Sequence, residues 1–170
     1  MSKAFTRESD DREERPVVPR PAAALPPGAK NYLTPGGAQL LRQELERLIQ
    51  VERPRIAASA ESGQSSPQLY ALNQRIQYLE DSLQSAEIVP PPAGPEDRVR
   101  FGATVTVRHR DGEQTRYRIV GVDEIDLDRD WVSWLSPIAR ALINARLGQR
   151  VRFKFPSGEE ELEILRIDYE

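Results

Sequence analysis

Five acidic residues crowd one short segment of the chain and supply the carboxylate oxygens that a hard cation prefers. They are Asp123, Glu124, Asp126, Asp128 and Asp130. A calcium loop of the EF-hand type also needs a glycine at its sixth position, a closing bidentate glutamate and flanking helices. The segment has none of these features. We therefore expect a solvated acidic loop here and no metal site.

The remaining side chains that commonly catalyse reactions or bind metals are few. The chain has no cysteine, which excludes disulfides and thiolate metal sites, and its single histidine is His109. A lone imidazole without a neighbouring cysteine or paired acid does not build a zinc site. We expect His109 to be a surface residue, and we predict no catalytic residue, no metal site and no cofactor.

The composition narrows the possible partners and compartments. Lys and Arg number 24 against 27 Asp and Glu, a net charge of −3, so no excess of positive charge attracts a phosphate backbone. We expect no autonomous sequence-specific binding to nucleic acid. The start lacks the apolar core of a signal peptide, and no stretch approaches the roughly 18 apolar residues of a membrane span. We expect a cytoplasmic protein that does not contact a membrane.

Apolar residues spaced alternately three and four positions apart predict a coiled-coil seam. Such spacing keeps one narrow stripe of a helix against a single partner helix. The series is Leu69, Leu72, Ile76, Leu79, Leu83 and Ala86, and the upstream segment carries Leu41, Leu45, Leu48 and Ile56. The turn-forming residues between the two segments predict an antiparallel helical hairpin, residues 31–89, which we call the finger, with its tip at about 62–68.

Local signals set the expected ends of the two helices of the finger. Thr34 followed by Pro35 predicts the first helix start, because the threonine hydroxyl caps free amides and proline suits the first helical position. Pro54 removes a backbone donor, so we expect a kink or a break near residues 50–54. The alternative is that the helix ends there and a second short helix begins. The return helix should run from near Gln68 to about Glu87.

Proline-rich segments separate the finger from its surroundings. Residues 1–30 combine a charge run with five prolines and offer little to bury, so we expect a disordered tail. Residues 90–98 contain Pro90, Pro91, Pro92 and Pro95 and predict a semi-rigid linker.

Residues 99–170 predict a second domain of the α+β class. Alternating apolar residues indicate strands, and Pro137 opens a helix that we expect to end near Gly148. The expected strands are 104–110, 115–120, 131–135, 151–155 and 162–167. We expect an antiparallel sheet with one helix against it.

Short motifs in both halves of the chain agree together with one known family. They include Arg118-Ile119-Val120-Gly121, Asp123-Glu124, Ser136-Pro137 and, in the finger, Leu33-Thr34 and Glu52-Arg53-Pro54. The motifs span nearly the whole chain, and through them the chain resembles the bacterial Gre transcript-cleavage factors, GreB more than GreA. The resemblance implies that the second domain is FKBP-like, without prolyl isomerase activity. It also implies docking on RNA polymerase at the rim of the secondary channel, with the finger pointing down that channel.

The finger tip departs from the family at the residues that do the chemistry. In the family, an Asp and a Glu in a Gly-Asp-x-x-Glu-Asn pattern help to hold a second magnesium that activates water to cut backtracked RNA. With Gly63 on the family glycine, Gln64 replaces the Asp, Pro67 the Glu and Gln68 the Asn. Neither replacement is an anionic ligand. The tip residues singled out are Glu61, Gly63, Gln64, Ser65, Ser66, Pro67 and Gln68.

The hairpin is also shorter than in the family by roughly a dozen residues, which retracts the tip by about 10 Å if both arms share the loss. We therefore predict a noncatalytic member of the family that modulates elongation or initiation. The alternatives are an active GreB-like cleavage factor that uses Glu61, a polymerase-binding regulator like the Rnk proteins, or an interaction module that no longer binds polymerase. We expect a monomer.

A second departure concerns docking on the polymerase. Family cleavage factors carry an Asp two residues before the Ser-Pro proline, where this chain has Leu135. An exposed Leu135 would make an apolar contact in its place, as in the Rnk proteins. The alternative is that Trp134 and Leu135 are only sheet and core residues. The docking residues that the resemblance implies are Leu135, Ser136, Pro137, Ile138 and Arg140.

Overall fold

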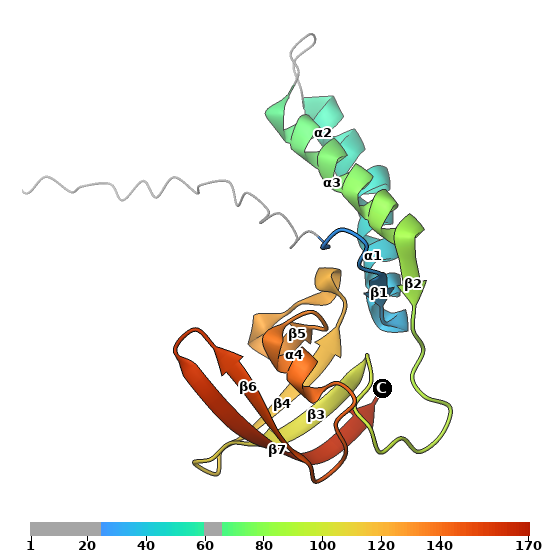
Figure 1. The fold of residues 1–170 in the computed structure, drawn as a ribbon. Coiled ribbons are helices and arrows are strands. Elements are labelled where there is room, and N and C mark those ends of the chain that lie inside the picture. Colours follow the sequence, from blue (N-terminus) through green and yellow to red (C-terminus); the bar gives the residue numbers. More distant parts are fainter. Residues whose placement is uncertain (1–24, 60–65) are drawn as a thin grey trace, which may run out of the picture.

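A long helical hairpin stands above a twisted five-stranded sheet, and an extended segment joins the two parts (Figure 1). The computed structural model describes residues 25–59 and 66–170. Helices and a sheet segregated along the chain place the protein in the α+β class, as predicted. No helix within the described ranges combines the length and the hydrophobicity needed to cross a membrane.

The first helix, α1 (Pro35–Arg47), begins where the capping signal predicts. Thr34 is the N-cap: its hydroxyl oxygen accepts a hydrogen bond from the Gly37 N–H at 3.0 Å. Pro35 occupies the first helical position, where its missing N–H costs nothing.

The helix neither breaks nor ends at Pro54. It widens into a π-helical turn, η1 (Leu48–Glu52), and continues as α2 (Arg53–Ser59). The Arg53 N–H donates to the Leu48 carbonyl, five residues back. Proline cannot donate to the carbonyl four residues back, and this wider turn lets the helix continue past it.

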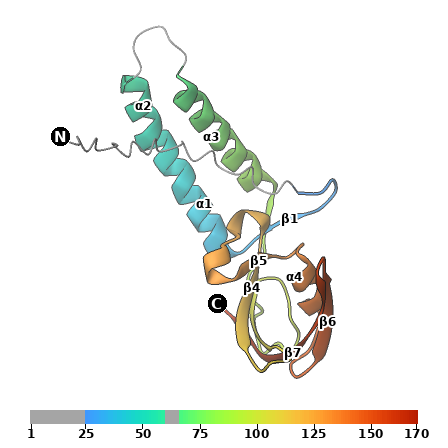
Figure 2. The ribbon, with the colours of Figure 1, turned by 90° about the vertical axis from the view of Figure 1, so that its left-hand side faces the viewer.

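The second arm of the hairpin, α3 (Pro67–Ser85), runs back beside α1 and α2 (Figure 2). Five of the six residues of its predicted stripe pack into the hairpin core, and Leu69 is the exception. Across the interface the Arg75 guanidinium donates to both carboxylate oxygens of Glu44, at 2.9 and 3.1 Å. The buried members of this core are Leu33, Ala38, Leu41, Leu48, Ile76 and Leu79.

Two three-residue strands, which no pattern in the sequence predicts, close the base of the hairpin. They are β1 (Asn31–Leu33) and β2 (Ala86–Ile88), which pair in parallel. The Asn31 side-chain amide, which is buried, donates to the Ser82 carbonyl at 3.0 Å. Strands this short carry no alternation signal. The expected helix end near Glu87 is therefore two residues too late, because Ala86 already has extended backbone.

The sheet has the strand order β5-β4-β3-β7-β6. Three of its four pairings are antiparallel, but β5 runs parallel to β4, which corrects the expectation of a wholly antiparallel sheet. Between β4 and β5 lie two 3₁₀ turns, η2 (Val122–Glu124) and η3 (Leu127–Arg129). The strands are β3 (Ala103–Arg108), β4 (Gln114–Val120), β5 (Trp131–Ser133), β6 (Arg150–Phe155) and β7 (Gly158–Tyr169).

The helix α4 (Pro137–Leu142) covers one face of the sheet and completes a second core. It ends earlier than predicted, and Asn144 beyond it adopts φ of 68° in the left-handed region. The strand β7 is longer than predicted because it pairs with both β3 and β6. The fully buried side chains of this core are Val99, Ala103, Val105, Val107, Ile119, Ala139, Leu142, Leu162 and Ile164.

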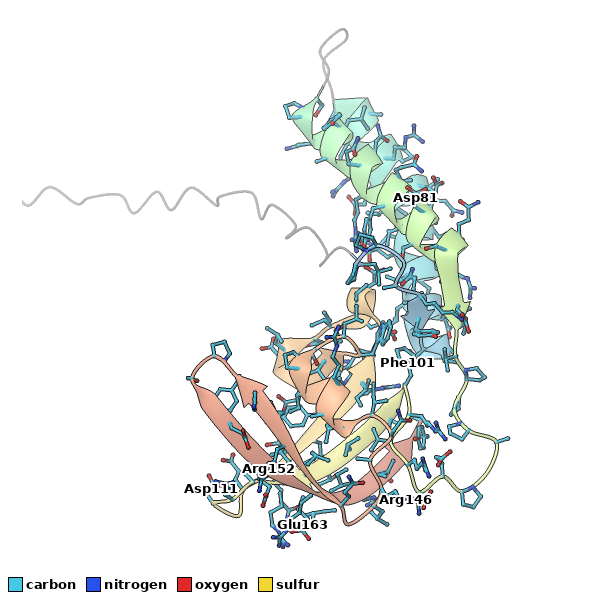
Figure 3. The ribbon with its side chains drawn as sticks, viewed as in Figure 1. Asp81, Phe101, Asp111, Arg146, Arg152 and Glu163 are labelled. Atoms are coloured by element: carbon cyan, nitrogen blue, oxygen red, sulfur yellow. The ribbon has the colours of Figure 1, made fainter. Side chains whose placement is uncertain are left out.

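The opposite face of the sheet is charged. Arg108 donates to Glu163 at 2.8 Å, and Arg152 to Glu161 at 3.4 Å. Figure 3 labels Arg152 and Glu163 at the outer surface of this part. Alternation between an apolar face and a charged face is what a sheet covered on one side requires.

Candidate functional site

The predicted finger tip is only partly within the described residues. Glu61, Gly63, Gln64 and Ser65 lie outside them. Ser66 precedes α3, and its carbonyl accepts from the Tyr70 N–H at 3.1 Å. Pro67 takes the first helical position, where it supplies no side-chain oxygen.

The predicted docking residues lie together around the start of α4. Ser136 is the N-cap of this helix, since its hydroxyl accepts from the Ala139 N–H at 3.2 Å. Pro137 and Arg140 are exposed on the first turn, and Ile138 packs against the sheet core. Leu135 is half-buried. The residues available to a partner on this segment are therefore Pro137, Arg140 and part of Leu135.

A groove of about 560 Å³ runs beside α4, where the base of the finger meets the sheet domain. Its lining combines Tyr32 of β1 with Phe101 and Trp134 of the sheet domain. The Tyr32 ring lies 5.0 Å from Trp134 and 5.6 Å from Phe101, centroid to centroid. Figure 3 shows Phe101 at this junction. Trp134 therefore packs against the core and also lines an open surface.

Arginine side chains border the aromatic lining of this groove. Arg100 and Arg140 both contribute to it, together with Ile143. Glu87 lines the same groove, so an apolar floor lies beside charged groups of both signs, a composition typical of surfaces that bind protein segments. Arg140 was a predicted site residue, whereas Tyr32 and Arg100 were not. In the sequence, only the aromatic and basic residue types of Tyr32 and Arg100 could have indicated a role, because the residues of the groove come together only in the fold.

The predicted solvated acidic loop is wrong for two of its five residues. Glu124 is only 9% exposed, and both Glu124 and Asp123 accept hydrogen bonds from the finger. Asp126 instead accepts from the Asp128 N–H at 3.1 Å and caps η3. Within the described residues, no cluster of three or more His, Cys, Asp or Glu side chains is placed to hold a metal ion.

His109 is not the surface residue that the sequence suggests. Its side chain is 15% exposed, and its Nδ1 contacts the Glu160 carboxylate. Its Nε2 lies 3.0 Å from the Thr115 hydroxyl. The imidazole therefore ties β7 to the β3–β4 hairpin and acts structurally.

Two hydrogen-bond donors of the finger, Tyr78 and Arg75, have pKa values above their ordinary values. Burial raises the pKa of the Tyr78 hydroxyl, and its hydrogen bond to Asp123 raises it further. The hydrogen bond to Glu44 raises the pKa of the Arg75 guanidinium, which lies 5.5 Å from the Tyr78 ring. Tyr78 is thus paired with Asp123, and Arg75 with Glu44.

Comparisons with known protein sequences agree on one family. Residues 94–169 match the family model "Transcription elongation factor, GreA/GreB, C-term". The chain is 40% identical over 154 aligned residues to "Transcription elongation factor GreB" of Neisseria meningitidis serogroup A, covering 82% of this chain and 94% of that protein. It is 41% identical over 156 to "Transcription elongation factor GreA" of Alkalilimnicola ehrlichii, covering 83% and 99%. A solved structure, "Prokaryotic transcription elongation factor GreA/GreB from Nitrosomonas europaea", matches 82% of this chain and all of that one, with 24% identity and a TM-score of 0.41.

Proposed function

The chain belongs to the GreA/GreB family of transcription elongation factors, and we propose that it binds RNA polymerase at the secondary channel without stimulating RNA cleavage. The observation that carries the proposal is the tip sequence: Gln64 and Pro67 stand where the family pattern has its two acids. The finger then occupies the channel and modulates elongation or initiation.

The chemistry of the tip supports the noncatalytic half of this proposal. Mg²⁺ takes hard oxygen ligands and is usually held by one or two carboxylates completed by water and phosphate. The Gln64 side chain offers a neutral carbonyl, and Pro67 offers no side-chain oxygen. Glu61 is the one acid near the turn, at a shifted position, and catalytic metals tolerate little misplacement.

The length of the finger supports it as well. The alignment with the Neisseria relative has 154 positions but draws on only 82% of the chain, so the relative has residues in the aligned span that this chain lacks. In this proposal the missing residues belong to the hairpin. A loss of roughly a dozen residues shared by two helical arms retracts the tip by about 10 Å.

In this proposal the polymerase docks at α4 and at the groove beside it. Pro137 and Arg140 are exposed there, beside the aromatic lining from Tyr32 and Trp134. In this proposal residues 31–89 form a coiled-coil finger, 90–98 a linker and 99–170 an FKBP-like docking domain. The protein acts in the cytoplasm as a monomer.

Binding to polymerase is the direct test. We expect the protein to co-elute with bacterial core RNA polymerase in gel filtration and to be displaced by an active GreB, because both would occupy the same channel. The measurement is the amount of bound protein as GreB is titrated. Failure to bind core polymerase under any condition would favour the interaction-module alternative. Binding that GreB leaves unaffected would place the site elsewhere.

Arg140 offers a sharper test of the docking surface. Arg140→Glu reverses a charge at the rim of the groove, and we expect it to weaken polymerase binding by about tenfold, as reversal of a charge at an interface does. Arg116→Glu is the matched control, since Arg116 is exposed on the charged face of the sheet. Equal affinities for the two variants, measured by fluorescence anisotropy, would contradict docking at α4.

A further inference from the structure

Two adjacent acids of the sheet domain hold different arms of the finger. Glu124, at the end of η2, accepts from the Thr34 N–H at 3.0 Å and from the Thr34 hydroxyl. It also accepts from the Gly121 N–H at 3.0 Å. A carboxylate this buried is stable only when donors replace its water, and here two donors at the N-terminus of α1 and the Gly121 N–H of its own turn do so.

Asp123 makes the equivalent contact with the other arm. It accepts from the Ser82 hydroxyl at 2.5 Å and from the Tyr78 hydroxyl, both of α3. Ser82 and Tyr78 are four positions apart, so they lie on the same face of the helix. The two carboxylates thus fix two separate points of the hairpin.

The backbone is shaped for this close approach. A Cβ atom at Gly37 would lie 1.9 Å from Glu124 Oε1, and one at Gly121 would lie 2.1 Å from the Tyr32 carbonyl oxygen. Neither distance is sterically possible, so any larger residue displaces the contact. Glycine at both positions lets the finger base and η2 touch.

We infer that Asp123 and Glu124 form a clasp that sets the direction of the finger relative to the sheet domain. A single attachment point would leave the finger free to pivot about it, whereas two points on different arms remove that rotation. The finger also meets the sheet domain through the ring contacts of Tyr32 with Phe101 and Trp134, and the first turns of α1 lie beside Arg118 and Trp131. The clasp belongs to the free protein and holds whether or not the chain binds polymerase.

The inference is tested by a distance measurement between the two parts of the full-length chain. Because the chain has no cysteine, Gln74→Cys in α3 and Gln114→Cys in β4 place two spin labels at exposed positions without competing sites. We expect pulsed electron paramagnetic resonance to give one narrow distance distribution. Adding Asp123→Asn and Glu124→Gln should at least double its width while the circular dichroism spectrum stays unchanged.

Two further variants separate the clasp from general effects on the fold. Asp128→Asn removes one negative charge from an exposed acid of the same loop and should leave the distribution narrow. Gly37→Ala reaches the clasp from the finger side, and it should broaden the distribution even if the double variant fails to fold. A narrow distribution in a folded clasp variant would overturn the inference, as would equal broadening in Asp128→Asn.

Discussion

In backtracked elongation complexes incubated with Mg²⁺, the purified protein should leave the rate of RNA cleavage the same as with polymerase alone. An authentic GreB under the same conditions should shorten the RNA at least about 100-fold faster, because in the proposed function a second metal needs the two acids that Gln64 and Pro67 replace. The measurement is the fraction of shortened RNA against time on a sequencing gel. Rapid shortening by this protein would overturn the proposal and favour the alternative in which Glu61 substitutes.

Restoring the tip acids tests whether cleavage is prevented by the missing carboxylates or by the short finger. Gln64→Asp with Pro67→Glu rebuilds the acidic pattern on the short finger. We expect this variant to remain inactive, because in the proposed function a finger retracted by about 10 Å holds its tip short of the active centre. Strong cleavage by the variant would show instead that the finger is long enough and that only the acids are missing. Gln64→Asn with Pro67→Gln is the matched control that makes the same changes in size without the charge.

Leu79→Ala should destabilise the finger by about 3 kcal/mol, within the range of about 2 to 5 kcal/mol for a buried leucine. Leu79 is 0% exposed at the centre of the hairpin core, so the substitution leaves a cavity between the two arms. The measurement is urea unfolding followed by the helical circular dichroism signal.

Leu40→Ala is the matched control for this substitution. Leu40 lies on α1 of the same finger but is 59% exposed, so its truncation should change the free energy of unfolding by less than about 0.5 kcal/mol. Similar losses in the two variants would contradict the packing of the hairpin described above.

The groove and the clasp both lie where the finger meets the sheet domain. Tyr32, which follows the buried Asn31 of β1, lines the groove, and Thr34, two residues later, enters the clasp. A partner seated against Tyr32 and Arg140 would therefore contact the finger base and the sheet domain together. In the proposed function, docking and the direction of the finger are set by neighbouring residues of one short segment.

Much of the fold follows from local patterns in the sequence. The spacing of Leu72, Ile76 and Leu79 predicts the apolar stripe, and Thr34 with Pro35 predicts the helix start. The family assignment and the absence of acids at Gln64 and Pro67 are also properties of the sequence alone. These signals work because capping and amphipathic periodicity act between residues a few positions apart.

Only the tertiary structure decided how the two parts meet. Thr34 and Glu124 are 90 positions apart, and no local pattern marks either as the other's partner. The acidic segment looks solvated in the sequence because carboxylates usually are, and donors from the finger reverse that expectation for Asp123 and Glu124. The β1–β2 pair and the parallel direction of β5, whose strand the sequence does predict, depend on pairing with distant strands and not on their own three residues.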